Sequence, residues 1–277
     1  MYKKKLHALF NLKFNPFSSQ VPTEALWSSP AIESFCWRIE NQVGEGGFAL
    51  AIGDPGTGKS AALRILAGRL AARGELLTGE LTRPQASLAD FYRELGDLFG
   101  VALSPHNRWA GAKVLREKWL AHIDASLYRP VLLVDNAEEM NPSSFSELRL
   151  LSSAELDSRS ILTIVFAGDH RLAARLESAE LLPIASRVRT RLRAEALPPQ
   201  QLRHCLDHLL AKAGNPKLLS GGLAQTLCEH AAGNLRLLIN LGNDLLSAAL
   251  QQEREELDEK LFFEVFDSAP KPKRSRR

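Results

Sequence analysis

Short runs of apolar residues alternate, along the first two thirds of the chain, with longer segments whose apolar residues recur at helical spacing. The runs predict four strands, at 48–52, 76–81, 131–134 and 161–166. Continuous apolar runs of this length are typical of strands buried on both faces of a parallel sheet. The segments between them predict helices at 61–70, 88–99, 110–126 and 143–153. This alternation predicts an α/β fold in which helices flank both faces of a parallel sheet.

The pattern changes near residue 197. Beyond it, apolar spacing predicts three helices with no strand between them, at 200–213, 222–232 and 235–251. We therefore expect four parts: a lead-in at 1–45 that packs on the α/β core, an α/β domain at 46–196, a small helical domain at 197–267, and a basic disordered tail at 268–277. The lead-in is expected to contain a helix that starts near Pro30.

The loop after the first predicted strand reads Gly53-Asp-Pro-Gly-Thr-Gly-Lys59-Ser60 and matches the G-x-x-x-x-G-K-[ST] pattern of phosphate-binding loops. Its glycines allow a tight turn, so that backbone N–H groups reach phosphate oxygens at the positive end of the next helix. Lys59 is expected to reach the β- and γ-phosphates, and the Ser60 hydroxyl to ligate Mg²⁺. A chance match is the alternative, but the apolar strand and the alanine-rich helix supply the context that the motif needs. The predicted nucleotide-binding residues are Gly53, Asp54, Pro55, Gly56, Thr57, Gly58, Lys59, Ser60 and Ala61.

A second candidate element of the site is an acidic residue that follows the strand predicted at 131–134. Asp135 ends this apolar run, which places its carboxylate at the carboxyl edge of the sheet, beside the phosphate loop. There it is expected to hold Mg²⁺ through water. The alternative is that Asp135 only caps the next element.

Several segments together resemble the AAA+ ATPases of the ExeA/TnsC-like group. The resemblance covers roughly residues 10 to 250, and its more discriminating parts are Leu-Arg-Leu-Leu-Ser152 and Gly-Asn-Leu-Arg236. The segments that carry it are Phe14–Phe17, Val131–Glu139, Glu147–Ser152, Glu155–Arg159, Ile164–Asp169 and Gly233–Arg236.

This resemblance implies a P-loop AAA+ fold with the helical domain as a lid, ATP with Mg²⁺ as cofactors, and an ATP-dependent homo-oligomer. It implies a polar γ-phosphate sensor at Gly168-Asp169. It also implies an arginine that reaches into the neighbouring subunit's site, for which Arg187 is the first choice over Arg189 and Arg191. Arg236 matches a second sensor of the γ-phosphate. For each arginine the alternative is an ordinary surface charge.

The sequence departs from the family at one position. AAA+ ATPases usually place glutamate directly after the metal aspartate, whereas this chain has Asn136. An amide orients water but takes no proton, so loss of the general base is expected to slow hydrolysis by roughly 10² to 10⁴-fold. Glu138 or Glu139 would take the place of the missing general base if the loop turned back. We therefore expect a slow ATP hydrolase with Lys59, Asp135, Asn136, Glu138 and Arg187 as its catalytic residues.

Composition and charge add less. An apolar fraction of 45% and a charged fraction of 24% over 277 residues are ordinary for a globular protein. No apolar run is long enough to span a membrane and no secretory signal is recognisable, so we expect a cytoplasmic location. Three isolated cysteines, Cys36, Cys205 and Cys228, argue against disulfides and zinc.

The net charge of +3 comes from the two ends of the chain. Eight of the 35 basic residues lie in the first five and last seven positions, which leaves 27 bases against 32 acids, or about −5, elsewhere. The basic tail could neutralise nucleic-acid phosphates or serve only as a solubilising end.

Three functions fit these observations. The first is a regulatory ATPase that oligomerises with ATP on double-stranded DNA and recruits or activates a transposase or other recombination protein. The second is an assembly or adaptor ATPase for a protein complex such as a secretion system, without DNA binding. The third is a nucleotide-bound scaffold that hardly hydrolyses ATP. The lack of a membrane span or further domain, together with the basic tail, favours the first.

DNA contacts are poorly marked in the sequence. Lys113, Arg116 and Lys118 lie on or near one predicted helix and are the better candidates for phosphate contacts. Trp37 and Trp109 each adjoin an arginine, and we expect them to be half-buried packing residues rather than stacking platforms. No helix-turn-helix or zinc module is visible, which predicts sequence-tolerant binding to the DNA backbone.

Overall fold

The computed structural model describes residues 2–103, 107–156 and 158–266, with residues 2–5 described by their backbone alone. The chain forms two compact units. The α/β unit comprises Ser28–Glu195, and the helical unit combines the residues up to Trp27 with those from Ala196 onwards. The expected basic tail at 268–277 lies outside the described residues.

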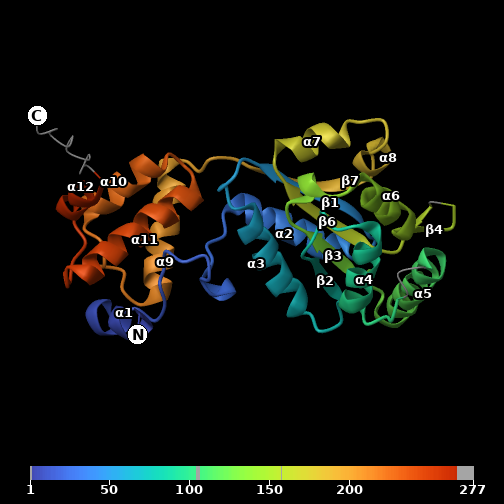
Figure 1. The fold of residues 1–277 in the computed structure, drawn as a ribbon, viewed down its shortest axis with the longest axis horizontal. Helices are drawn as coiled ribbons and strands as arrows, with labels where there is room; N and C mark the ends of the chain where they lie inside the picture. The colour runs from blue at the N-terminus through green and yellow to red at the C-terminus, as the bar shows by residue number, and fades with distance from the viewer. Residues whose placement is uncertain (1, 104–106, 157, 267–277) are drawn as a thin grey trace, which may run out of the picture. The chain divides into compact units, whose positions relative to one another are not determined.

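The α/β unit contains a five-stranded sheet with the order β2-β3-β6-β1-β7, in which every pair is parallel (Figure 1). The strands are β1 (Gly47–Gly53), β2 (Thr78–Leu81), β3 (Val131–Val134), β6 (Thr163–Gly168) and β7 (Val188–Ala194). All residues of β3 and β6 are buried, as expected for central strands covered on both faces. The predicted α/β fold with a parallel sheet flanked by helices is confirmed.

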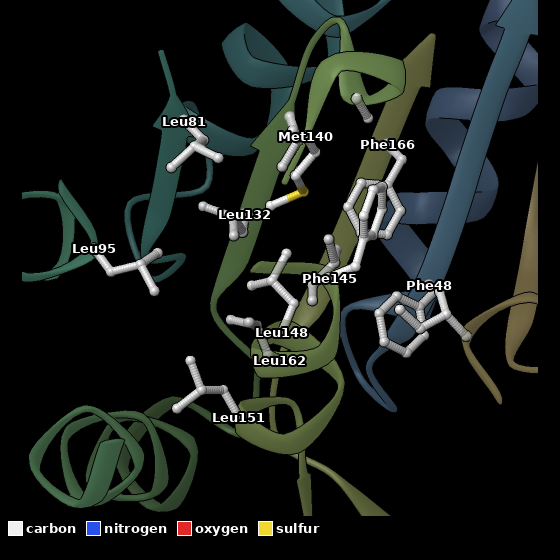
Figure 2. Close-up of a cluster of buried hydrophobic side chains, with 14 of the residues drawn as sticks. Phe48, Leu81, Leu95, Leu132, Met140, Phe145, Leu148, Leu151, Leu162 and Phe166 are labelled. Carbon is white, nitrogen blue, oxygen red and sulfur yellow. The ribbon is translucent and has the colours of Figure 1, made fainter. Parts of the chain in front are cut away.

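Helices surround this sheet. On one side, α2 (Pro30–Gln42) contacts β7 and α3 (Lys59–Ala71) contacts β1, β2 and β6. Aromatic and leucine side chains of α4 (Leu88–Phe99), α5 (Arg108–Ser126) and α6 (Pro142–Leu151) pack with alternate residues of the strands into one hydrophobic cluster. Figure 2 shows part of this cluster, in which Phe145 of α6 lies against Phe166 of β6, with ring centroids 5.2 Å apart. The remaining short elements are η2 (Ala137–Glu139), β4 (Ser153–Ala154), β5 (Arg159–Ser160), α7 (His170–Leu176) and α8 (Leu182–Ala185).

The edge strand β7 has a different character from the central strands. Its Thr190 and Leu192 are buried while Arg189, Arg191 and Arg193 are exposed. This alternation is typical of a strand with one solvated face. Because arginines occupy every second position, no apolar run marks the strand in the sequence.

The helical unit is built from α9 (Pro199–Ala213), α10 (Gly221–Ala231), α11 (Leu235–Gln251) and α12 (Glu259–Phe266). The N-terminal segment adds α1 (Tyr2–Phe10) and η1 (Thr23–Ala25). Leucines from α9, α10 and α11 form the core of this unit. In both units, none of the described helices is long and apolar enough to cross a membrane.

The N-terminal segment corrects the expectation that residues 1–45 pack on the α/β core. Phe10, Leu12 and Phe17 are buried in the core of the helical unit. The backbone is fixed there as well, because Lys13 N donates to Ala213 O at 2.8 Å. Only residues from Ser28 onward belong to the α/β unit. The reason is that the apolar side chains of the lead-in complete a core shared with α9 and α11.

The three cysteines are free and buried. Burial raises the pKa of the Cys36 thiol to about 11 and that of Cys205 to about 12. At neutral pH these thiols are therefore protonated and act as small apolar core residues.

The contact between Phe17 and α11 gives a test of the N-terminal docking. A methyl group at Gly242 would overlap the Phe17 ring. Helix propensity alone favours alanine over glycine by about 1 kcal/mol, but overpacking costs about 1–3 kcal/mol. We expect Gly242→Ala to lower the free energy of unfolding in urea, measured by circular dichroism. Gly221→Ala is the control, because its methyl meets nothing within 4 Å. A Gly242→Ala variant as stable as the wild type would contradict the docking.

Candidate functional site

The loop between β1 and α3 has the backbone that phosphate binding requires. Gly56 and Gly58 have φ of 87° and 97°, in the left-handed region that favours glycine. Gly53 ends β1 so close to β7 that a Cβ there would overlap Ala194 O. After Gly58 the chain enters α3 at Lys59, so the first N–H groups of this helix face the loop.

Lys59 lies across this loop. Its Nζ donates to Gly53 O at 2.8 Å and to Asp54 O at 2.9 Å. Thr57 Oγ1 also donates to Asp54 O, at 2.8 Å, and closes the turn. The ammonium group is thus held at the mouth of the loop, where a phosphate would meet both its charge and the backbone N–H groups.

Asp135 follows β3 at the carboxyl edge of the sheet, the same edge at which β1 ends. β6 fixes this relation, because it pairs Val134 with Phe166 on one side and Ile52 with Gly168 on the other. The Asp135 side chain is partly buried and accepts from Asn136 N at 3.0 Å.

The predicted Mg²⁺ ligands fit this ion chemically. Ser60 and Asp135 offer a hydroxyl and a carboxylate oxygen, and Mg²⁺ prefers oxygen ligands. Among the described residues no group of three or more His, Cys, Asp or Glu side chains could hold a metal ion.

The turn after Asp135 brings a carboxylate back to the sheet. Asn136 is exposed and adopts φ 52°, which starts the short helix η2. The Glu138 side chain is only 7% exposed and accepts from Asp169 N at 3.3 Å. A Cβ on Gly168 would lie 2.5 Å from Glu138 Oε2, so glycine at the end of β6 makes room for this carboxylate.

Two arginines of α7 fix this turn. Arg175 donates to Glu138 O at 2.6 Å and lies over the Phe145 ring. Arg171 lies 3.6 Å from Glu138 Oε1 and donates to Asp169 Oδ2 at 2.8 Å. The turn after β3 and the start of α7 therefore form one connected polar cluster.

Asp169, the expected sensor position, caps α7 by accepting from Arg171 N at 2.8 Å. Burial opposes its ionisation, but hydrogen bonds and charge from Arg171, together with the charge of Lys59, hold the pKa of Asp169 below its usual value. The next residue, His170, lies 3.3 Å from Asp54 Oδ1 of the phosphate loop. Sequence reasoning missed His170, Arg171 and Arg175, whose only signal was their place after a strand that ends near the loop.

Arg187 lies at the amino ends of the parallel strands, opposite to the ends at which the phosphate loop lies. It directly precedes β7, whose first residue, Val188, pairs with Phe48 at the start of β1. The phosphate loop follows the end of β1, so Arg187 and the loop of the same chain are at opposite edges. Arg187 donates to Pro183 O at 2.6 Å.

The remaining predicted residues lie on helices. Arg236 is an exposed residue in the first turn of α11, in the helical unit. On α5, Lys113 and Lys118 are exposed, while Arg116 donates to Leu150 O at 2.8 Å. The expectation that Trp37 and Trp109 are half-buried is wrong, because they are 64% and 78% exposed.

Comparison with known proteins relates part of the α/β unit to one family. Residues 41–176 match the family described as AAA domain. General secretion pathway protein A of Aeromonas hydrophila is 29% identical over 199 residues, which cover 71% of this chain and 36% of that protein. The chain therefore spans little more than a third of this relative.

Solved structures share the fold. The Aeropyrum pernix ORC2 protein in its ADP form matches with a TM-score of 0.72 at 14% identity, over 94% of this chain and 73% of that one. Drosophila ORC bound to DNA matches with a TM-score of 0.66 at 19% identity, over 90% and 63%. At these identities the likeness is one of fold.

The buried position of Glu138 gives a stability test. Glu138→Ala leaves Asp169 N–H without its acceptor and removes one of the two carboxylates beside Arg171, so we expect a loss of about 1–3 kcal/mol in the free energy of unfolding. The neighbouring exposed Glu139 is the matched control, and Glu139→Ala should change stability by less than about 0.5 kcal/mol. Urea denaturation of both variants compares them. Equal stability would mean that the Glu138 carboxylate is not held at the end of β6.

Proposed function

We propose that this chain binds ATP with Mg²⁺ and hydrolyses it slowly. Its residues 41–176 match the family described as AAA domain. The observation that carries this proposal is the position of Lys59 on the loop between β1 and α3, at the same sheet edge as Asp135. Both groups adjoin the place where a helix N-terminus meets a glycine-rich turn, which is the general setting for phosphate binding.

Different residues of the site would bind different parts of the nucleotide and its metal ion. The N–H groups after Gly53 would hold the phosphate oxygens, and Lys59 would exchange its carbonyl acceptors for the β- and γ-phosphates. Ser60 and Asp135 would hold Mg²⁺, which neutralises charge on the transferred phosphoryl group. Asp169 stands at the end of β6, where a polar side chain would sense the γ-phosphate.

Slow hydrolysis follows from the groups that could activate water. Asn136 carries an amide, which takes no proton. Glu138 has a carboxylate at the right edge, but this side chain is only 7% exposed, accepts from Asp169 N and lies 3.6 Å from Arg171. These contacts engage it in holding the turn to the end of β6. We therefore propose that Glu138 positions α7 and the turn, and that the chain lacks an effective general base.

Substitution of Asn136 tests this account of the rate. Asn136→Glu should raise the rate of single-turnover ATP hydrolysis by about 10²-fold or more, the range of 10² to 10⁴ being typical of general-base catalysis. Asn136→Gln is the control, because it lengthens the side chain without adding a base. Wild-type turnover near 10 s⁻¹, a typical enzyme rate, would contradict slow hydrolysis, as would an equal rise in both variants.

For the biological role we propose a DNA-associated regulator that forms ATP-dependent oligomers on double-stranded DNA and acts on a transposase or other recombination protein. Arg187, at the sheet edge away from its own loop, would act on the site of a neighbouring subunit. On α5, the exposed Lys113, Lys118 and Trp109 offer cations and an aromatic ring to a nucleic-acid backbone. The fold is shared with Drosophila ORC bound to DNA, which supports this role.

The second candidate is an assembly ATPase for a protein complex. The similarity to general secretion pathway protein A favours it. It predicts nucleotide-dependent oligomers that ignore DNA.

Co-sedimentation with double-stranded DNA separates the two roles. With a slowly hydrolysed ATP analogue at low salt, we expect the protein to pellet with DNA, less so at moderate salt because phosphate contacts weaken steeply. The double variant Lys113→Gln and Lys118→Gln should pellet less. Its control, Lys212→Gln with Lys217→Gln, removes the same charge from exposed residues of the helical unit. Wild-type protein that ignores DNA under every nucleotide condition would favour the assembly ATPase.

A further inference from the structure

One pair of side chains joins the phosphate loop to the start of α7. His170 Nε2 lies 3.3 Å from Asp54 Oδ1. Asp54 is the second residue of the loop, and His170 is the first residue of α7. The two side chains are 73% and 70% exposed, and a pair this exposed adds little to the stability of the fold. Its effect is therefore expected on the loop itself.

Asp54 also holds the loop through its backbone. Its carbonyl oxygen accepts from Lys59 Nζ at 2.9 Å and from Thr57 Oγ1 at 2.8 Å. The same Lys59 ammonium donates to Gly53 O at 2.8 Å. Asp54 therefore contacts the phosphate-binding lysine through its backbone and α7 through its carboxylate. Because Lys59 has to leave these carbonyl oxygens to reach a phosphate, nucleotide binding removes one of the contacts that hold Asp54 in place.

The start of α7 is fixed from its other side. Asp169 caps the helix by accepting from Arg171 N at 2.8 Å, and its own N–H donates to Glu138 at 3.3 Å. One turn further along, Arg175 donates to Glu138 O at 2.6 Å. These bonds tie the helix to the turn after β3. When the loop moves, the helix does not follow it freely, so the movement stretches the contact with His170.

We propose that His170 is a positioning residue for nucleotide binding, which acts through Asp54 and restrains the empty loop. In this arrangement Lys59 stays bonded to the carbonyl groups of its own loop. The inference rests on the proposed function of that loop. A contact that belongs to the empty state opposes binding, so its removal shifts the equilibrium toward the bound state. Since exposed ion pairs are weak, we expect a gain in affinity of about two- to fivefold.

Charge alone predicts a different pattern. Phosphate is anionic, so loss of a histidine that carries positive charge when protonated would weaken binding, whereas loss of the Asp54 carboxylate would strengthen it. A histidine that contacted the phosphate directly would also weaken binding when removed. Only a contact that restrains the empty loop makes both substitutions strengthen binding. The direction of the change at His170 therefore separates these explanations.

Titration of a fluorescent ATP analogue with Mg²⁺ into the full chain tests the proposal. His170→Ala and Asp54→Ala should each bind the analogue at least about twofold more tightly than the wild type. The gain in the double variant should fall short of the product of the two single gains, because both substitutions remove the same contact. The matched control is His204→Ala, which removes an exposed histidine from α9 in the helical unit. It should leave the affinity unchanged.

The His170 ring gives a second readout that does not depend on affinity. In protein with isotope-labelled histidines, the nuclear magnetic resonance signal that is missing from His170→Ala identifies this ring. Saturation with the Mg²⁺-bound analogue should move that signal toward its position in Asp54→Ala, because the contact is lost in both cases. The His204 signal should not move. A His170 signal that stays in place when the wild type is saturated would overturn the proposal.

Two further outcomes contradict it. His170→Ala that binds the analogue as the wild type does, or more weakly, would show that the pair does not restrain the empty loop. Gains that multiply fully in the double variant would show that the two side chains act separately. In each case binding that is lost in Lys59→Ala would leave the proposed function standing. If Lys59→Ala binds as well as the wild type, or if no protein binds, the proposed function fails and this inference fails with it.

Discussion

The parallel pairing of β6 with β1 on one side and β3 on the other is the constraint on which the candidate site depends. Because all three strands run in the same direction, the loop after β1, Asp135 after β3 and Asp169 after β6 meet at one edge. The apolar residues that bury β6 on both faces hold this register. Loss of that burial would separate the groups even if each kept its local conformation.

The polar cluster at this edge links the loop between β1 and α3 to the rest of the unit. Asp54 of the loop lies beside His170, and the adjoining Asp169 and Arg171 contact Glu138. The loop between β1 and α3 is thus connected through side-chain contacts to α7 and to the turn that carries Asn136. The opposite edge carries arginines instead.

The sequence predicted those parts of the structure that are local. The phosphate loop is contiguous, and the central strands are apolar runs, so motif and pattern sufficed for Gly53–Ser60 and for β1, β3 and β6. The edge strand β7 was not predicted, because arginines fill its solvent-facing positions and interrupt the apolar pattern. The docking of Phe10 and Phe17 and the return of Glu138 to the end of β6 join residues far apart in the chain. Spacing along the sequence carries no signal for such contacts.

The central claim is that the loop between β1 and α3 binds a nucleotide with Mg²⁺. Titration of a fluorescent ATP analogue into the wild type and Lys59→Ala, each with Mg²⁺ and with EDTA, tests it most directly. The account predicts saturable binding to the wild type that weakens when Mg²⁺ is removed and is lost, or falls at least about tenfold, in Lys59→Ala. Equal binding by both proteins would contradict it, because the nucleotide would then be held elsewhere.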